Sequence, residues 1–123
     1  MSIAEGLASI QNEIPSNVTL VAVSKTKPLE AILEAYALGL RDFGENRAVE
    51  LVEKAKALPD DIRWHAIGHL QRNKASLVAP ISSLIHSVDS IRLYDELSKH
   101  SGEKLDVLIQ IHIADEQNKH GFY

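Results

Sequence analysis

The chain contains the run Thr19-Leu20-Val21-Ala22-Val23-Ser24-Lys25, a short apolar segment that ends in a lysine, and Pro28 follows soon after. Such a run predicts a buried strand. Proline suits the first turn of a helix, because its missing N–H has no partner there in any case. Apolar residues then recur at helical spacing up to Gly39, a residue type that often ends helices. The segment therefore predicts a strand, a turn and a helix.

The same strand–helix unit recurs along the chain. We expect strands at Thr19–Ser24, Arg41–Gly44, Arg63–Ile67, Leu84–Ser87 and Asp106–Ile113. Between them we expect helices at Pro28–Leu38, Asn46–Leu58, Gln71–Val78 and Ile91–His100, with a further helix, Ser2–Glu13, before the first strand. This alternation is typical of an α/β fold in which parallel strands are joined by right-handed crossovers.

Two architectures accommodate five such strands. One is a doubly wound open sheet, and the other is a (βα)8 barrel that stops early. A complete barrel of eight units needs about 200 residues or more, whereas this chain has 123. The residues alone therefore favour the open sheet.

The composition indicates one soluble domain over residues 1–123, since 45% of the residues are hydrophobic and the length is that of a typical domain. The absence of cysteine excludes a disulfide framework, a thiolate zinc site and a thiol nucleophile. Because 13 basic residues stand against 17 acidic ones, the charge gives no reason to expect nucleic acid as a partner.

Neither membrane insertion nor secretion is expected. No apolar run approaches the length of about 20 residues that a membrane span needs. Residues 1–7 contain Glu5 and lack the basic start of a signal peptide. We therefore expect a cytoplasmic protein.

Lys25 is the residue best suited to covalent chemistry. Strand alternation places Val21, Val23 and Lys25 on one face, with Lys25 at the carboxyl end of the strand, where ligands bind in parallel α/β folds. Two buried valines before it would partly desolvate the amine, lower its pKa and prepare it for Schiff-base chemistry. The alternative is a lysine that extends from the strand end into solvent.

Asn46 and His65 lie at or near the ends of the next two expected strands. Asn46 suits either a ligand contact or a plain helix N-cap. His65 suits either a contact at the same edge or a hydrogen-bonded core position. His65 and His69 lack the glutamate of the zinc-protease motif, so no metal site is expected.

Four segments occur together in one order: Val21–Pro28, Phe43–Asn46, Trp64–Lys74 and Leu108–Ile113. In this order and spacing they resemble the pyridoxal phosphate homeostasis protein family, whose members are similar to the barrel domain of alanine racemase. The resemblance implies a TIM-type (βα)8 barrel, with about five of its eight strands present in residues 1–123. It therefore favours the barrel over the open sheet.

The resemblance also implies a protein of cofactor homeostasis that carries pyridoxal 5'-phosphate (PLP) as an aldimine on Lys25. Asn46 and His65 match family positions beside the cofactor. The family has no established enzymatic turnover, so no catalytic residue is expected. Two alternatives stay open: a PLP-dependent racemase-like enzyme, which needs an acid–base group opposite Lys25, and an interaction module that binds no cofactor.

The family's phosphate-binding segments belong to the three units that this chain does not supply. The resemblance therefore implies that PLP binding by this chain alone is weakened or absent. It also leaves the first and fifth strands as open edges, and such edges readily pair with other chains. We accordingly expect self-association through these edges.

Overall fold

The computed structural model describes residues 2–102, 105–113 and 121–122. The strands are β1 (Ala22–Val23), β2 (Asp42–Glu45), β3 (Arg63–Ala66), β4 (Ser82–Val88) and β5 (Asp106–Ile109). The α-helices are α1 (Ile3–Glu13), α2 (Leu29–Ala37), α3 (Ala48–Ala57), α4 (Ala75–Val78) and α5 (Ile91–His100), and the 3-10 turn η1 (Arg72–Lys74) leads into α4.

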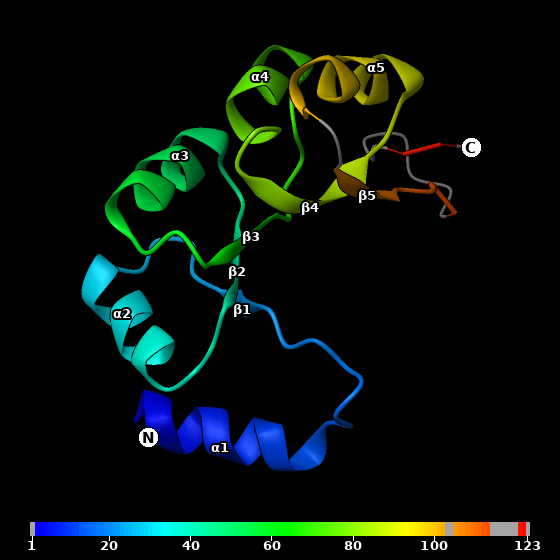
Figure 1. Cartoon of the computed structure of the whole chain (residues 1–123). Helices are drawn as coiled ribbons and strands as arrows, with labels where there is room; N and C mark the ends of the chain where they lie inside the picture. Colours follow the sequence, from blue (N-terminus) through cyan, green and yellow to red (C-terminus); the bar gives the residue numbers. More distant parts are fainter. Residues whose placement is uncertain (1, 103–104, 114–120, 123) are drawn as a thin grey trace.

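The strands form one sheet in the order β1-β2-β3-β4-β5, and each neighbouring pair is parallel. A doubly wound sheet reverses its strand order partway, and no reversal occurs among these strands. When right-handed crossovers add every strand on the same side, all the connecting helices lie on one face. Figure 1 shows α2 to α5 along one side of the sheet. The preference of the residues alone for an open doubly wound sheet is therefore wrong, and the sequential order is that of a barrel.

Several element boundaries differ from those expected. Only Ala22–Val23 of the first expected strand forms β1, paired with Phe43 and Gly44 of β2. The expected helix Gln71–Val78 divides into η1 and α4. The last strand ends at Ile109, and Ile111 instead forms a separate bridge with Phe122. Ile91–His100 matches its expected bounds, with the Ser90 hydroxyl accepting from the Leu93 N–H as N-cap.

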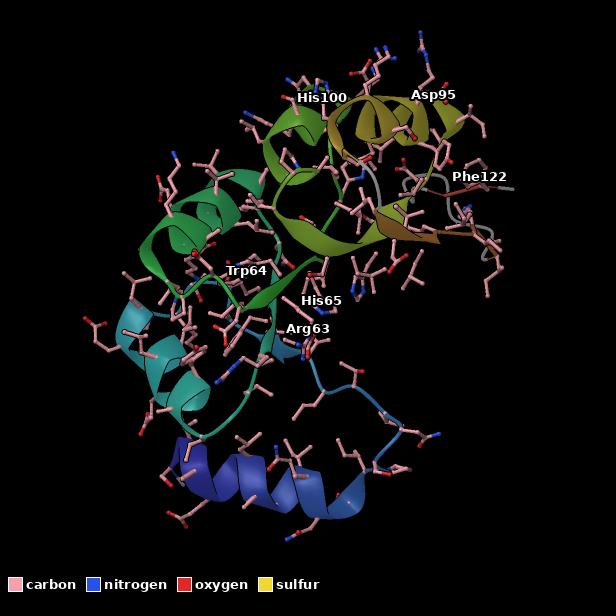
Figure 2. All side chains as sticks on the ribbon, viewed as in Figure 1. Arg63, Trp64, His65, Asp95, His100 and Phe122 are labelled. Atoms are coloured by element: carbon pink, nitrogen blue, oxygen red, sulfur yellow. The ribbon has the colours of Figure 1, made fainter. Side chains whose placement is uncertain are left out.

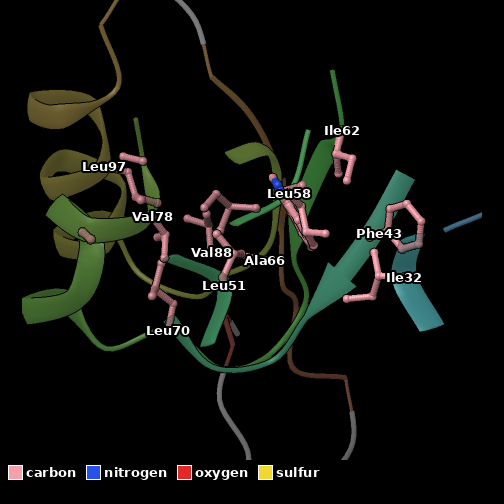
Figure 3. Packing of buried hydrophobic residues seen from close by; sticks show 14 of the residues in the cluster. Ile32, Phe43, Leu51, Leu58, Ile62, Ala66, Leu70, Val78, Val88 and Leu97 are labelled. Carbon is pink, nitrogen blue, oxygen red and sulfur yellow. The ribbon is translucent and has the colours of Figure 1, made fainter. Parts of the chain in front are cut away.

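The hydrophobic core lies between the sheet and its helices, on one face only. Phe43 and Ile85 come from strands, and Ile32, Leu51 and Leu97 come from helices. Figure 3 shows several of these side chains meeting between the two layers. Leu20 and Ala22 pack against the same core, on the face that strand alternation predicts for them.

The opposite face of the sheet is only partly covered. A methyl group added at Gly44 would lie 3.1 Å from Ile67 Cδ1 and 3.3 Å from Val21 Cγ1, so these three residues meet on this inner face. Val23 is 52% exposed, although the sequence predicts its burial. Among the residues that the structure describes, strand β1 has a neighbour on one side only, and the inner face beside it is open. No helix among the described residues combines the length and the apolar character of a membrane span.

Helix α3 offers a test of the one-sided core. Leu51 is 1% exposed and Val49 is 52% exposed on the same helix. Leu51→Ala should lower the free energy of unfolding by about 2–5 kcal/mol. Val49→Ala should change it by less than about 0.5 kcal/mol. Urea unfolding of both variants measures this difference, and equal losses would contradict the assignment of the core to this face.

Candidate functional site

The carboxyl ends of the strands meet at one edge of the sheet. Lys25 follows β1, Asn46 follows β2, His69 follows β3 and Asp89 follows β4. In parallel α/β folds this edge is where ligands bind. The expected grouping of Lys25 and Asn46 at one edge is therefore consistent with the strand order.

Lys25 lies in a tight turn directly after β1. The Ser24 N–H donates to the Gly44 carbonyl at 2.9 Å, and the Lys27 N–H donates back to the Ser24 carbonyl at 3.1 Å. The Lys25 side chain is exposed, which agrees with the alternative of a lysine that extends from the strand end into solvent. Across residues 2–102, 105–113 and 121–122, no hydrogen bond or ion pair occupies this amine. A primary amine in this setting is open to an incoming electrophile.

A buried polar cluster lies beneath this turn. Lys54 Nζ, on α3, donates to the Ser24 carbonyl at 2.7 Å, to Glu45 Oε2 at 2.9 Å and to Glu50 Oε2 at 3.0 Å. The Ser24 hydroxyl also donates to Glu45 Oε2. Glu45 is 1% exposed and Lys54 is 6% exposed, so the cluster sits inside the protein and joins the first two strand–helix units.

The sequence patterns do not single out Glu45, Glu50 or Lys54, but one signal points to them. Glu45 alternates with Gly44 in β2 and therefore faces the helices, where a carboxylate needs a buried partner. Glu50 and Lys54 stand four residues apart on α3, the spacing of a helical ion pair. The hydrogen bond from Lys54 lowers the pKa of Glu50; burial opposes this shift, and the Thr26 N–H adds to it.

Asn46 is exposed and does not cap the following helix. The N-cap of α3 is Arg47, which makes no side-chain cap hydrogen bond, so the N-cap interpretation of Asn46 is wrong. The Asn46 backbone instead touches the loop after β3. A methyl group at Gly68 would lie only 2.6 Å from the Asn46 carbonyl oxygen, so glycine is needed for this contact.

The loop after β3 is also held from β4. The Ser87 hydroxyl donates to the Gly68 carbonyl at 2.5 Å. His69 Nδ1 lies 3.4 Å from Asp89 Oδ2. The ends of β2, β3 and β4 are thus fixed relative to one another through side-chain and backbone contacts.

His65 is buried on the inner face, at 6% exposure. Its Nε2 lies 3.0 Å from Asp42 Oδ1, and its Nδ1 lies 3.0 Å from His86 Nε2. Arg63 donates two hydrogen bonds to the Asp42 carboxylate, from Nε to Oδ1 at 3.0 Å and from Nη2 to Oδ2 at 2.7 Å. Figure 2 shows Arg63 and His65 on the side of the sheet away from Trp64. Both ring nitrogens of His65 therefore have partners.

This inner polar chain lines a hollow of about 430 Å³, together with Val21 and Asp106. Burial alone raises the pKa of Asp42, but hydrogen bonds from Arg63 and His65 outweigh it and hold that pKa below its ordinary value of 3.8. Burial lowers the pKa of His86, and the nearby charge of His65 lowers it further. These contacts therefore favour an ionised Asp42 and a neutral His86.

Comparisons with known proteins identify the family to which this sequence is similar. The family model described as "Alanine racemase, N-terminal domain" matches residues 2–122. The pyridoxal phosphate homeostasis protein of Homo sapiens is 43% identical over 114 residues, which cover 83% of this chain and 42% of that protein. The protein of the same name from Escherichia coli strain K12 is 40% identical over 136 residues, covering 97% of this chain and 58% of that protein.

Solved structures of similar sequence have the same fold over nearly the whole of this chain. PipY of Synechococcus elongatus PCC7942, solved without PLP, superimposes with a TM-score of 0.92 at 42% identity, over 99% of this chain and 59% of PipY. The form of PipY with PLP bound gives a TM-score of 0.88 at 41% identity, over 99% and 58%. The expected resemblance is confirmed, and the chain spans about half the length of the curated relatives it matches.

The lowered pKa of His86 predicts a pH dependence of stability. In the unfolded chain, histidine takes up a proton as the pH falls through about 6.5, before the folded state does so. The unfolded state then binds more protons, so the free energy of unfolding falls as the pH drops below about 6.5.

The variant His86→Gln removes this titration and keeps a hydrogen-bonding partner for His65 Nδ1. Its free energy of unfolding should fall less than that of the parent chain between about pH 7.5 and about pH 5.5. Urea unfolding at both pH values measures the difference. The same pH dependence in both proteins would contradict this role of His86.

Proposed function

The chain belongs to the alanine racemase N-terminal domain family, and on that premise we propose that it binds pyridoxal 5'-phosphate through Lys25 as a protein of cofactor homeostasis. The observation that carries the proposal is the Lys25 amine, which is exposed on a fixed turn at the ligand-binding edge of the sheet. PipY, which is 41% identical, has been solved with PLP bound. The expected cytoplasmic location stays a prediction.

The residues present suit the aldehyde end of this cofactor. PLP supplies an aldehyde that condenses with a neutral primary amine and releases one molecule of water. The chain must therefore hold a lysine amine that is free of ion pairs and open to approach. Lys25 meets both conditions among the described residues.

We assign Asn46 and His65 to the walls of the same site. Asn46 is exposed beside the Gly68 loop, so its amide is available for a polar contact. Both nitrogens of His65 already have partners, so His65 contributes the surface of its ring and not a further hydrogen bond. No role in catalysis is assigned to either residue.

We propose that residues 1–123 form one domain, which corresponds to the N-terminal portion of an alanine racemase-like barrel. Phosphate contacts supply much of the affinity and orientation for this kind of cofactor. We expect those contacts to come from other segments of the family's barrel. Binding by this chain alone is therefore expected to be weaker than in the longer relatives.

Borohydride trapping tests the role of Lys25. After mixing with PLP and reduction, the pyridoxyl label should map to Lys25, and Lys25→Ala should abolish specific labelling because its amine is the nucleophile. Lys27→Ala is the matched control, since Lys27 is an exposed lysine in the same segment. Absorbance near the visible edge before reduction gives a second measurement. Labelling spread over other lysines with Lys25 unmodified would overturn the assignment.

We also propose that the chain associates with itself through the open edges of β1 and β5. Each of these strands has one neighbour in the sheet, and unpaired strand edges attract further strands. On these two strands Val23 is 52% exposed, Leu108 is 49% exposed and Ile109 is 52% exposed. Pairing between copies would satisfy the edge hydrogen bonds and cover these apolar side chains.

Light scattering over a wide range of concentrations tests this association. The mean mass should rise with concentration for the parent chain. Ile109→Lys should reduce the rise, because a charged side chain on an edge strand opposes pairing. Ile10→Lys, at an exposed isoleucine on α1, is the matched control and should leave it unchanged. A constant monomeric mass would contradict the proposal.

A further inference from the structure

Both peptide bonds of Lys25 are held by side chains of α3. The carbonyl of the bond before Lys25, from Ser24, accepts from Lys54 Nζ at 2.7 Å. The N–H of the bond after it, from Thr26, donates to Glu50 Oε2 at 3.0 Å. Lys54 and Glu50 also pair with each other at 3.0 Å. The two side chains therefore form a clamp that spans the Lys25 backbone.

The Lys54 end of the clamp is rigid. Its three contacts, with the Ser24 carbonyl, Glu45 and Glu50, use all three protons of the ammonium group. The side chain of Lys54 is 7% exposed, and that of Glu45 is 0% exposed. Hydrogen bonds to charged groups are stronger than neutral ones, more so away from water. Lys54 thus fixes the Ser24 carbonyl in one position.

The Glu50 end holds a backbone conformation that the residue itself disfavours. Thr26 has φ +62°, in the left-handed region, which is unusual for a β-branched residue. Such a conformation persists only where the surroundings impose it. Without the Glu50 contact, the Thr26 backbone would relax and rotate the peptide bond that joins it to Lys25. The direction in which the Lys25 side chain leaves the turn would then change.

We propose that Glu50 and Lys54 are positioning residues that orient Lys25 toward an aldehyde-bearing ligand by clamping its two peptide bonds. The inference rests on the proposed function of Lys25 and deepens it. Neither Glu50 nor Lys54 touches the ligand in this proposal. Each acts on the backbone from which the reactive amine extends.

Glu50 carries the test, because Lys54→Met would leave Glu45 as a buried carboxylate without its cation and is expected to unfold the chain. Glu50→Ala should reduce borohydride-trapped labelling of Lys25 by PLP about tenfold, the effect of losing one hydrogen bond to a charged group. Glu50→Gln keeps an acceptor oxygen for the Thr26 N–H and should restore most of the labelling. Glu53→Ala, at an exposed glutamate of the same helix, should label as the parent chain does.

Amide hydrogen exchange gives a second readout that needs no cofactor. Exchange of the Thr26 N–H, measured by NMR, should accelerate about tenfold in Glu50→Ala and recover in Glu50→Gln. All measurements are made well below the unfolding temperature of each variant. A merely structural role would lower that temperature without changing the ratio of Lys25 to Lys27 labelling.

The outcomes separate this inference from the proposed function. If the parent chain labels at Lys25 and Glu50→Ala labels equally well, the clamp does not position the lysine and the inference is wrong. If the parent chain does not label at Lys25, the proposed function fails. Unchanged Thr26 exchange in Glu50→Ala would then show that the clamp itself is absent in solution.

Discussion

The buried ammonium of Lys54 joins parts of the protein that the sheet connects only weakly. Strand β1 pairs with β2 over two residues, Ala22 with Phe43 and Val23 with Gly44. Lys54 continues this connection beyond the last strand residue by binding the Ser24 carbonyl from the helix that follows β2. Desolvation makes such a buried pair costly, and apolar side chains in place of both Lys54 and Glu45 could stabilise the packing as well. An apolar side chain could not hold a carbonyl in one direction, so the charge serves the placement of the turn.

The two faces of the sheet have different tasks. The face toward the helices carries the apolar core and most of the stability. The inner face carries the chain of Arg63, Asp42, His65 and His86, in which each polar group is held by its neighbours. These four residues lie within the strands, whereas Lys25 and Asn46 lie beyond the carboxyl ends of β1 and β2. The polar inner face thus supports the site from behind, and in the proposed site His65 alone of these four residues contributes, through the surface of its ring.

Local chemistry explains which features the sequence predicts well. Helix α5 is predicted because Ser90 caps it and its apolar residues recur at helical spacing. The end of α2 is predicted because glycine readily adopts the left-handed conformation that ends helices. In the structure Gly39 has φ +102°. The position of Lys25 and Asn46 at one edge of the sheet is predicted because parallel order brings the carboxyl ends of strands together. These features depend on a few neighbouring residues each.

Other features depend on tertiary structure and escape prediction. Alternating strands and helices suit both a doubly wound sheet and a barrel, and only the strand order distinguishes them. The length of β1 depends on its pairing with β2, and Asn46 loses its cap role because α3 starts two residues later. The contacts of Lys54 join residues 30 positions apart in the sequence. Spacing within one helix reveals the pair with Glu50 but not the carbonyl of Ser24.

The sequential order of the strands also bears on how the protein is made. Each strand pairs with the strand that precedes it in the sequence, so no strand waits for a distant partner to be synthesised before it can join its predecessor. Protein chains emerge from the ribosome with the N-terminal part first. The turn that carries Lys25 needs only β2 and α3 for its contacts, so translation as far as Lys54 supplies every residue that holds it. The residues that make these hydrogen bonds are therefore all present before the later strands are synthesised.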